Sequence, residues 1–361
     1  MSKPSIVIVS PALADSNNGN WQTARRWQQF LSSHFNVRIT RQWSVTPDTA
    51  NDQVMIALHA RRSADSIAAW ASSRGLNCNA AEHGSPGLVL ALTGTDLYRD
   101  IETDDTARKS LELAQHLVVL QEKGPEKLPE HVQHKAHVIF QSTTSRKTLE
   151  KPKRRLKVVM VGHLRDEKMP QTLMEAAVLL REYGDIHIDH IGGPLDEELA
   201  DAARQTMQAC PNYRWLGNLP HGVTRSRIQR AHVLVHASKM EGGAHVIMEA
   251  VCSGTPVVAS FMDGNVGMLG SNYAGYFPVG NSSALANLLT QLKDDIVNPK
   301  TLPPGKQSVY SKLKIQCAER ARLFAPENEQ AQLIRLVQQA TPHNHSVNPQ
   351  AINREVPHAD I

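Results

Sequence analysis

The sequence is poor in cysteine and in aromatic residues, and each shortage excludes a class of protein. Its four cysteines, Cys78, Cys210, Cys252 and Cys317, have neither the spacing of metal ligands nor that of a disulfide framework. Aromatic residues make up 5% of the chain, and none alternate with basic runs as a stacking platform for nucleic acid would need. The formal net charge of +4 suits phosphate-bearing ligands without requiring nucleic acid as a partner.

Long apolar runs are also missing. No run approaches the roughly 18 residues of a membrane span, so we expect no stable membrane association. Residues 1–4 lead directly into an apolar segment at 6–9, which argues against a signal peptide. The scattered cysteines and this N-terminal segment together predict a cytoplasmic protein. We also expect no cofactor and no metal centre held by cysteine ligands.

The patterning predicts an α/β fold in two parts. Apolar runs of strand length alternate with helical spacing in both halves of the 361 residues, which is long enough for two domains. A segment at 147–157 holds six basic residues and one proline, and we interpret it as a solvated interdomain linker. We therefore expect two Rossmann-like domains that face each other across a cleft, with boundaries at 1–150 and 151–307. Residues 341–361 are polar and are predicted to be disordered.

The segment 239–256 is the most informative stretch of the chain. It follows a predicted buried strand at 233–237, and its own helix is stopped by Gly254 and Pro256. Free backbone N–H groups at the start of that helix favour an anion such as a diphosphate. Glu249 can accept hydrogen bonds from a vicinal diol such as a ribose, and Glu241 from a sugar placed over the turn. The alternative interpretation is a pair of solvated surface glutamates beside a tight turn.

The spacing of these two glutamates resembles a known motif. Glu241 to Glu249, followed by Ala250 and Gly254-Thr255-Pro256-Val257, is similar to the E-x7-E motif of nucleotide-sugar glycosyltransferases with the GT-B fold, of retaining family 4 type. In that family the second Glu holds the nucleotide ribose and the first contacts the donor sugar. The resemblance implies that Glu241, Gly242, Gly243 and Glu249 bind the donor. It also implies that residues 308–340 form terminal helices that return to the N-terminal domain.

A second motif of that family is only partly present. Family members usually show Gly-Arg-Leu-x-x-x-Lys, whose Arg and Lys grip the diphosphate, and Lys168 matches the Lys. His163 stands at the Arg position, and a neutral imidazole cannot replace a permanent guanidinium. Either Arg165 bends in, or His163 binds phosphate only partly protonated. Because no convincing Asp-x-Asp lies at a strand end, we expect Lys168 and Arg165 to neutralise the diphosphate without a metal.

In the N-terminal half, polar residues follow two predicted strands. His59 comes directly after the strand at 54–58, and Asp96 lies just beyond the strand at 88–92. Ligands gather at the carboxyl ends of parallel strands. Family members commonly carry a second His where this chain has Thr93. From the resemblance, we predict His59, Asp96 and Glu241 as the catalytic residues.

Arginines gather near the same predicted edge of the sheet. They are Arg25, Arg26, Arg61, Arg62 and Arg99. Paired arginines on a helix are usually solvated, yet a cluster of guanidinium forks is what a small phosphate-like anion needs. We predict that Asn20, Arg25, Arg61 and Arg62 bind the acceptor, with Arg26 in reserve. Residues 263–270 hold three glycines and are predicted to be a loop that approaches a ligand closely.

Four segments together resemble a narrower family, the selenosugar synthases of selenoneine biosynthesis. They are residues 58–63, 92–100, 162–168 and 263–270, and the similarity extends over 4–335. That family transfers a sugar from UDP-N-acetylglucosamine or UDP-glucose to selenophosphate and forms a carbon–selenium bond at the anomeric carbon. The resemblance implies a UDP-sugar and selenophosphate as partners. Two alternatives stay open: an ordinary UDP-sugar glycosyltransferase acting on a lipid or sugar hydroxyl, and a nucleotide-sugar binding protein or epimerase without transfer activity.

Overall fold

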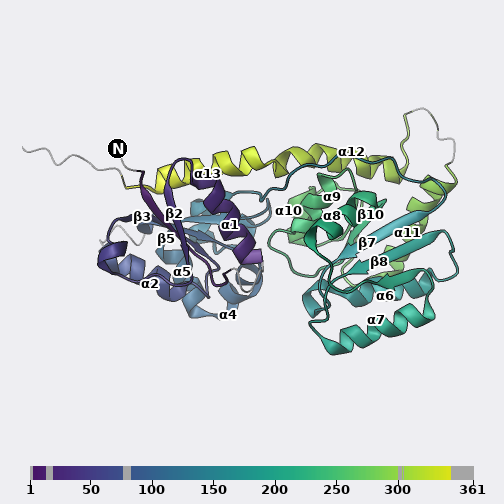
Figure 1. Cartoon of the computed structure of the whole chain (residues 1–361), viewed down its shortest axis with the longest axis horizontal. Coiled ribbons are helices and arrows are strands. Elements are labelled where there is room, and N and C mark those ends of the chain that lie inside the picture. The colour runs from purple at the N-terminus through teal and green to yellow at the C-terminus, as the bar shows by residue number, and fades with distance from the viewer. Residues whose placement is uncertain (1–2, 14–18, 76–82, 300–302, 304, 343–361) are drawn as a thin grey trace, which may run out of the picture.

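Two six-stranded parallel sheets form the framework, one in each half of the chain (Figure 1). In the computed structural model, the described residues are 3–13, 19–75, 83–299, 303 and 305–342. The tail predicted to be disordered, 341–361, lies outside the described residues from position 343 onward. Residues 14–18, which precede helix α1 (Gly19–Leu31), lie outside them as well.

The first sheet has the strand order β2-β1-β3-β4-β5-β6, and all neighbouring strands are parallel. Its strands are β1 (Ser5–Val9), β2 (Asn36–Thr40), β3 (Asp52–Leu58), β4 (Ser85–Ala91), β5 (Ala114–Val119) and β6 (Ala136–Val138). In the register, Ile8 lies opposite Ile56 and Ile56 opposite Val89, so apolar side chains line up across the sheet. Strands buried on both faces explain the uninterrupted apolar runs in the sequence.

Helices cover both faces of this sheet. They are α1 (Gly19–Leu31), α2 (Ala64–Ser73), α4 (Ile101–Thr103), α5 (Asp105–Leu113) and the last helix of the chain, α13 (Pro326–Ala340). Because successive side chains of a strand point to opposite faces, β1 serves two cores. Ile6 and Ile8 pack in the core that α1 and α13 share, and Val7 and Val9 in the core beneath α2 and α5.

The second sheet has the strand order β12-β11-β10-β7-β8-β9 and is also parallel throughout. Its strands are β7 (Leu156–Val161), β8 (Ile186–Ile191), β9 (Tyr213–Trp215), β10 (Val233–His236), β11 (Val257–Ser260) and β12 (Tyr276–Phe277). The helices around it are α6 (Pro170–Leu179), α7 (Glu197–Ala209), α8 (His221–Arg230), α9 (His245–Val251), α10 (Asp263–Leu269), α11 (Ser282–Val297) and α12 (Val309–Ala321). The predicted fold class, two Rossmann-like domains of the GT-B type, is confirmed.

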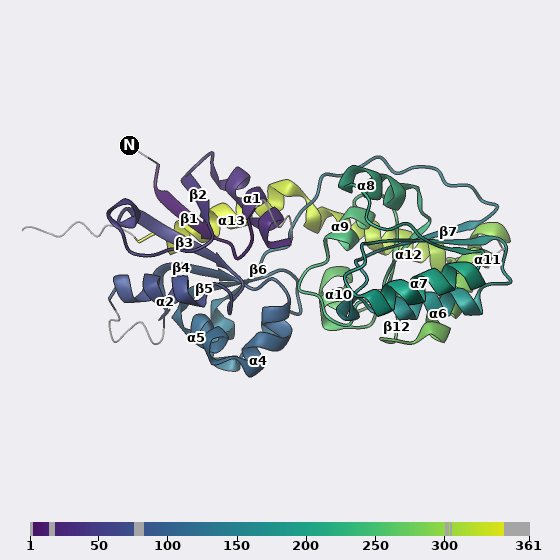
Figure 2. The same cartoon turned by 60° about the horizontal axis from the view of Figure 1, so that its bottom comes forward.

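The chain passes twice between the domains. The first crossing leads from β6 to β7, and the second leads from α12, which packs on the C-terminal domain, to α13 on the N-terminal domain (Figure 2). The prediction of a solvated first crossing fails at Lys151, whose Nζ donates hydrogen bonds to Thr255 Oγ1 at 3.0 Å and to the Gly254 carbonyl at 3.3 Å. Burial and the nearby Lys314 lower the pKa of Lys151 to about 8.

Within the described part of the chain, no helix combines the length and the apolar character that a bilayer crossing requires. The described cysteines, Cys210, Cys252 and Cys317, are buried free thiols.

A buried carboxylate attaches α13 to the N-terminal domain. Glu329 is 0% exposed and accepts hydrogen bonds from the Arg26 guanidinium at 3.0 Å, from Trp27 Nε1 at 2.6 Å and from Ser142 Oγ at 2.5 Å. These donors belong to α1 and to the first crossing. The carboxylate therefore joins three segments that are far apart in the sequence.

We predict that Glu329→Ala destabilises the protein strongly. The substitution removes one partner of a buried ion pair and leaves the positive charge of Arg26 without its carboxylate. We expect the free energy of unfolding to fall by about 3–5 kcal/mol. Urea denaturation followed by circular dichroism measures this cost. Glu327→Ala is the matched control, since Glu327 is exposed on the same helix and its loss should change stability little. Equal stability of both variants would show that Glu329 does not hold α13 on the N-terminal domain.

Candidate active site

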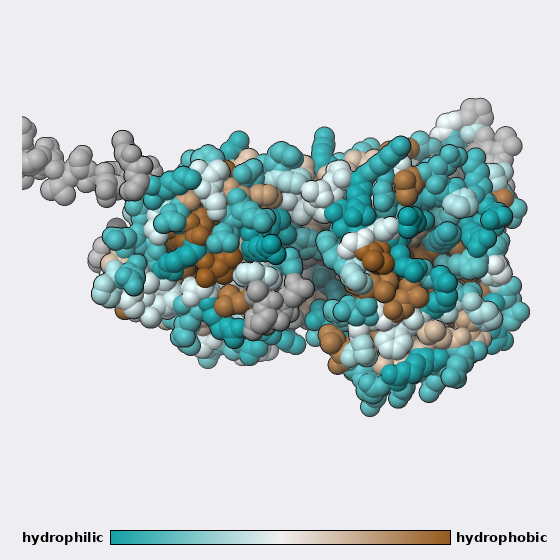
Figure 3. Space-filling view, viewed as in Figure 1, coloured by the Kyte–Doolittle hydropathy of each residue, from teal (hydrophilic) through white to brown (hydrophobic). Residues whose placement is uncertain are grey.

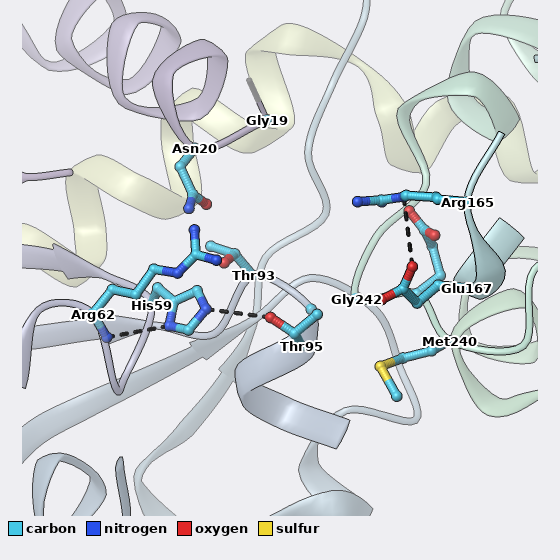
Figure 4. Close-up of a pocket in the computed structure, with 12 residues that line it drawn as sticks. Gly19, Asn20, His59, Arg62, Thr93, Thr95, Arg165, Glu167, Met240 and Gly242 are labelled. Atoms are coloured by element: carbon cyan, nitrogen blue, oxygen red, sulfur yellow. Dashed lines mark hydrogen bonds and ion pairs between the residues drawn. The ribbon is translucent and has the colours of Figure 1, made fainter. Parts of the chain in front are cut away.

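The carboxyl ends of the two sheets meet at a cavity between the domains. The cavity has a volume of about 230 Å³, and the molecular surface is hollowed between the two domains (Figure 3). Its lining comes from both domains, from Gly19, Asn20, His59, Arg62, Thr93, Gly94 and Thr95 on one side and from Arg165, Glu167, Met240, Glu241 and Gly242 on the other (Figure 4). The structure thus brings the two predicted clusters of the N-terminal half together with the turn that begins at Glu241.

The two walls touch through glycine backbones. Gly94, with φ +150°, lies against Gly242, and a Cβ added to Gly242 would stand 2.7 Å from the Gly94 Cα atom. A Cβ on Gly243 would stand 2.8 Å from Leu120 Cβ. Both glycines of the predicted donor turn are therefore needed for the close approach of the domains, and Gly242 also lines the cavity.

The prediction of a loop at 263–270 is wrong, because residues 263–269 form helix α10. The two glycines inside this helix, Gly264 and Gly267, face protein, whereas Gly270 at its C-terminal end has open space beside it. A side chain on Gly264 would overlap the Glu241 carbonyl, and one on Gly267 would overlap the Gln121 side chain of the N-terminal domain. Glycine is therefore required at positions 264 and 267 because the helix packs tightly between the donor turn and the opposite domain.

Glu241 is held by a cation of the neighbouring turn. The Lys168 ammonium lies 2.7 Å from Glu241 Oε2, and both side chains are half-buried. Burial alone would raise the pKa of Glu241, but Lys168 and His236 lower it below its ordinary value. Arg165, on the same turn as Lys168, lines the cavity with its Nε 3.9 Å from Glu167 Oε2. The predicted donor-binding cations thus lie beside the predicted donor-sugar glutamate.

His163 has one ring nitrogen committed to the backbone. Its Nδ1 accepts a hydrogen bond from the Gly193 N–H at 2.9 Å, which leaves the proton of a neutral ring on Nε2. Burial, together with Arg165 and Lys168, lowers the pKa of His163. His163 is thus a neutral hydrogen-bond donor at neutral pH. Of the two possibilities left by the sequence, the geometry favours Arg165 as the source of positive charge.

Glu249 lies outside the residues that line the cavity, deeper in α9. Its Oε1 accepts a hydrogen bond from His221 Nε2 at 2.6 Å, and Arg225 Nε lies 3.7 Å away. Neither His221 nor Arg225 was predicted from the sequence as a partner of Glu249. Their spacing of four residues places them on one face of α8, and this was the signal that could have found them.

His59 occupies a strained position at the opposite wall. Its φ of +76° is rare for a residue with a side chain, and the ring is 3% exposed. Nε2 lies 3.3 Å from Thr95 Oγ1, and Nδ1 lies 3.4 Å from the backbone nitrogen of Arg62 (Figure 4). Burial lowers the pKa of His59 even though Asp96 raises it. A neutral imidazole therefore faces the cavity.

Asp96 does not line the cavity. It is 0% exposed, and its carboxylate accepts hydrogen bonds from the backbone N–H groups of Thr93 at 2.9 Å, Gly94 at 2.8 Å and Ala60 at 3.1 Å. The carboxylate thus ties the loop after β4 to the loop after β3. Its contacts are those of a residue that shapes the wall around His59, and they differ from the predicted catalytic contact with substrate.

The predicted acceptor arginines separate into different environments. Arg62 lines the cavity, whereas Arg61 donates from Nε to Asp100 Oδ2 at 3.1 Å. Arg26 is bound to Glu329 and to His245, so its reserve role in acceptor binding is not supported by its position. Arg25 is exposed on α1 and is not among the lining residues. Of the residues predicted to bind the acceptor, Asn20 and Arg62 are the two that face the cavity.

Among the residues that the structure describes, no group of three or more His, Cys, Asp or Glu side chains is arranged to hold a metal ion.

The C-terminal domain matches a known family. Residues 141–301, from the first crossing to the end of α11, match the family model described as glycosyl transferases group 1. None of the curated proteins compared with this chain matches it. The family match identifies the chain as an enzyme, a glycosyltransferase.

Solved structures support the same class at the level of the fold. Sucrose-phosphate synthase from Thermosynechococcus elongatus is 18% identical, with a TM-score of 0.69 over 93% of this chain and 98% of that chain. HepE from Anabaena in complex with UDP-glucose is 13% identical, with a TM-score of 0.67 over 93% and 99%. A mutant of TarM from S. aureus, in complex with UDP among other ligands, is 15% identical with a TM-score of 0.55, and it matches 79% of this chain. This chain spans only 55% of the length of that TarM chain.

The two facing parallel-sheet domains have the GT-B fold. The match to the group 1 glycosyl transferases covers residues 141–301, which form most of the C-terminal domain.

We predict that Glu249→Gln lowers the pKa of His221. The hydrogen bond to Glu249 raises the pKa of His221 above its ordinary value of 6.5, and the amide carries no charge to sustain the shift. The pair stabilises the folded protein fully below pH 6.5, and this contribution is lost as pH rises through the raised pKa. Histidine-selective NMR titration checks the shift, with His187 as an internal control. An unchanged pKa of His221 would show that Glu249 is not its partner.

Proposed function

We propose that this glycosyltransferase is a selenosugar synthase. It transfers a sugar from UDP-N-acetylglucosamine or UDP-glucose to selenophosphate and forms a carbon–selenium bond at the anomeric carbon. The supporting observation is the cavity of about 230 Å³, whose described N-terminal wall offers Arg62, His59 and Asn20 but no carboxylate side chain. Such a wall suits a small anion better than it suits a lipid or a sugar.

The donor half of the proposal is supported by the C-terminal wall. Glu249 holds the ribose of UDP, and Glu241 contacts the donor sugar at the cavity. Lys168 offers three N–H donors, so it can bind Glu241 and a phosphate oxygen together. The fold shared with HepE and TarM, which were solved with UDP-glucose and UDP respectively, supports UDP as the nucleotide.

Charge on the leaving diphosphate is balanced, in this proposal, by side chains and not by a metal ion. Lys168 and Arg165 lie on one turn beside the cavity and are the two permanent cations of the donor side there. As the diphosphate leaves, negative charge grows on its oxygens, and fixed cations placed there stabilise the transition state. His163 adds a neutral N–H donor from the same turn.

The acceptor half depends on the N-terminal wall. Arg62 binds the phosphoryl oxygens of selenophosphate, and Asn20 at the start of the 13-residue helix α1 adds a polar contact. A lone pair on selenium attacks the anomeric carbon while the bond from that carbon to the diphosphate oxygen breaks, and UDP departs with the electron pair. A selenium nucleophile needs little deprotonation, so the neutral His59 positions the reactants.

A hydroxyl acceptor is the second candidate, and one observation favours it. His59 is neutral and lies 4.0 Å from Asp96 and 3.7 Å from Asp100, both buried carboxylates. A hydroxyl must lose its proton as it attacks, and a histidine beside a carboxylate can accept that proton. Arg62 at the same wall has no evident task in that reaction.

The buried free thiols of Cys210, Cys252 and Cys317 fit a reducing compartment, so we place the enzyme in the cytoplasm.

An assay of UDP release tests the proposed function. Each UDP-sugar is incubated with selenophosphate, with orthophosphate, and with glycerol or glucose as hydroxyl acceptors. We expect rapid UDP release with selenophosphate alone, a product that carries the isotope pattern of selenium in mass spectrometry, and an unchanged rate in the presence of EDTA. Release that depends on a hydroxyl acceptor would instead establish the second candidate, and abolition by EDTA with rescue by magnesium would refute metal-free catalysis.

We predict that Arg62→Ala raises the KM for selenophosphate about 10- to 100-fold. A charge-assisted hydrogen bond contributes about 1.5–3 kcal/mol, and Arg62 is the guanidinium that lines the acceptor side. Steady-state kinetics measures KM, and calorimetry with UDP should show unchanged donor affinity. Arg61→Ala is the matched control with a smaller effect, since Arg61 is paired with Asp100. A larger effect at Arg61 would move the acceptor pocket away from Arg62.

A further inference from the structure

A side-chain contact links the two walls of the cavity a short distance from the reacting groups. Arg26 lies on α1 of the N-terminal domain, and His245 is the first residue of α9. The Arg26 Nη1 atom lies 3.2 Å from the Nε2 atom of His245. The two residues are 219 positions apart in the sequence. Neither has a part in the proposed chemistry.

Arg26 is held in a fixed direction before it reaches His245. Its Nε atom lies 3.0 Å from Glu329 Oε2, and its Nη2 atom lies 3.2 Å from Glu329 Oε1. The guanidinium is a rigid planar fork, so two bonds to a buried carboxylate determine where the remaining nitrogen points. Glu329 is itself fixed by Trp27 and Ser142. The bond to His245 is therefore made with little further loss of side-chain freedom.

His245 is in the state that this bond requires. Burial lowers the pKa of His245 to about 3, together with the nearby charges of Arg26, His221 and Arg225 and against the opposing effect of Glu241. The ring therefore stays neutral in ordinary assay conditions. Since a guanidinium can only donate, Nε2 of His245 must be the acceptor.

The contact lies between the elements that carry the cavity. Gly19 and Asn20 at the start of α1 line the cavity, and Arg26 follows about two turns later on the same helix. On the other side, His245 follows directly after the turn that contains Glu241 and Gly242. A change in the distance between Arg26 and His245 therefore changes the distance between the acceptor wall and the donor turn.

We propose that Arg26 and His245 are positioning residues that hold the two domains in the closed arrangement and thereby keep Glu241 opposite the acceptor wall. The closure rests on the structure alone, and its effect on transfer rests on the proposed function. The ion pair between Lys127 and Asp263, which also joins the two domains, lies nearer to solvent. Lys127 and Asp263, 2.5 Å apart, are 40% and 46% exposed, and such pairs contribute little.

Variants of His245 test the proposal and leave the buried Arg26–Glu329 pair in place. His245→Leu introduces an apolar side chain and removes the ring nitrogen that accepts the hydrogen bond. His245→Gln supplies a carbonyl oxygen that can accept a hydrogen bond from Arg26. Lys127→Met is the control, because it removes a more exposed polar contact between the same two domains. Melting temperatures confirm that each variant is folded.

The first measurement is small-angle X-ray scattering of the ligand-free proteins. We expect a larger radius of gyration for His245→Leu, and wild-type values for His245→Gln and Lys127→Met. If His245→Leu scatters as the wild type does, or if His245→Gln opens as far as His245→Leu, the contact does not hold the domains closed and the proposal is overturned.

The second measurement is turnover with UDP-sugar and selenophosphate. We expect kcat to fall at least tenfold in His245→Leu with unchanged affinity for UDP, and to recover in His245→Gln. A pure loss of kcat would show that alignment is affected and donor binding is not. Opening without any loss of turnover would overturn the positioning role. If the wild type itself shows no selenophosphate-dependent turnover, the proposed function fails while the scattering result still decides the closure.

Discussion

The arrangement of this enzyme depends on a backbone contact between two glycines of different domains. Gly94 and Gly242 approach so closely that a single methyl group on Gly242 would force the walls apart. Around this point, Gly243 meets Leu120, and Gly267 on α10 meets Gln121. Because these contacts involve backbone, they set the separation of the domains more rigidly than long side chains could. The cavity is small for this reason, with a volume of about 230 Å³.

Within that space, charge is distributed so that two anions can be accommodated. Cations stand on opposite walls, Arg62 on one and Lys168 with Arg165 on the other. No carboxylate side chain of the described N-terminal wall lines the cavity, and the buried Asp96 and Glu329 are engaged by backbone N–H groups and by Arg26 respectively. Histidines near the site have lowered pKa values, so they supply hydrogen bonds without adding charge. Two negatively charged reactants would repel each other in such a space unless each wall carried its own cation.

The sequence predicted the parts of the fold that depend on local pattern. Parallel strands buried on both faces leave continuous apolar runs, so β3, β4, β7 and β10 could be located. The glycine-bearing turn at Glu241 could likewise be placed between β10 and β11. The contacts that failed prediction are set by distant partners. Three glycines at 263–270 favour a loop by local propensity, yet residues 263–269 form a helix in which Gly264 packs against Glu241 and Gly267 against Gln121. Arg26 looked available for a ligand because its partners, Glu329 and His245, lie 303 and 219 positions away.

The same distance in sequence explains why the acceptor wall depends on the end of the chain. Helix α13 supplies Leu333, Leu336 and Val337 to the core that it shares with α1, so the cover on this face of the first sheet is complete only when the chain has returned from the other domain. Glu329 on that helix fixes Arg26, and α1 in turn presents Gly19 and Asn20 to the cavity. The last helix is therefore a structural part of the wall that we assign to the acceptor, although none of its residues lines the cavity. Because α12 is bound to the C-terminal domain and α13 to the N-terminal domain, this helix pair also limits how far the two walls can separate.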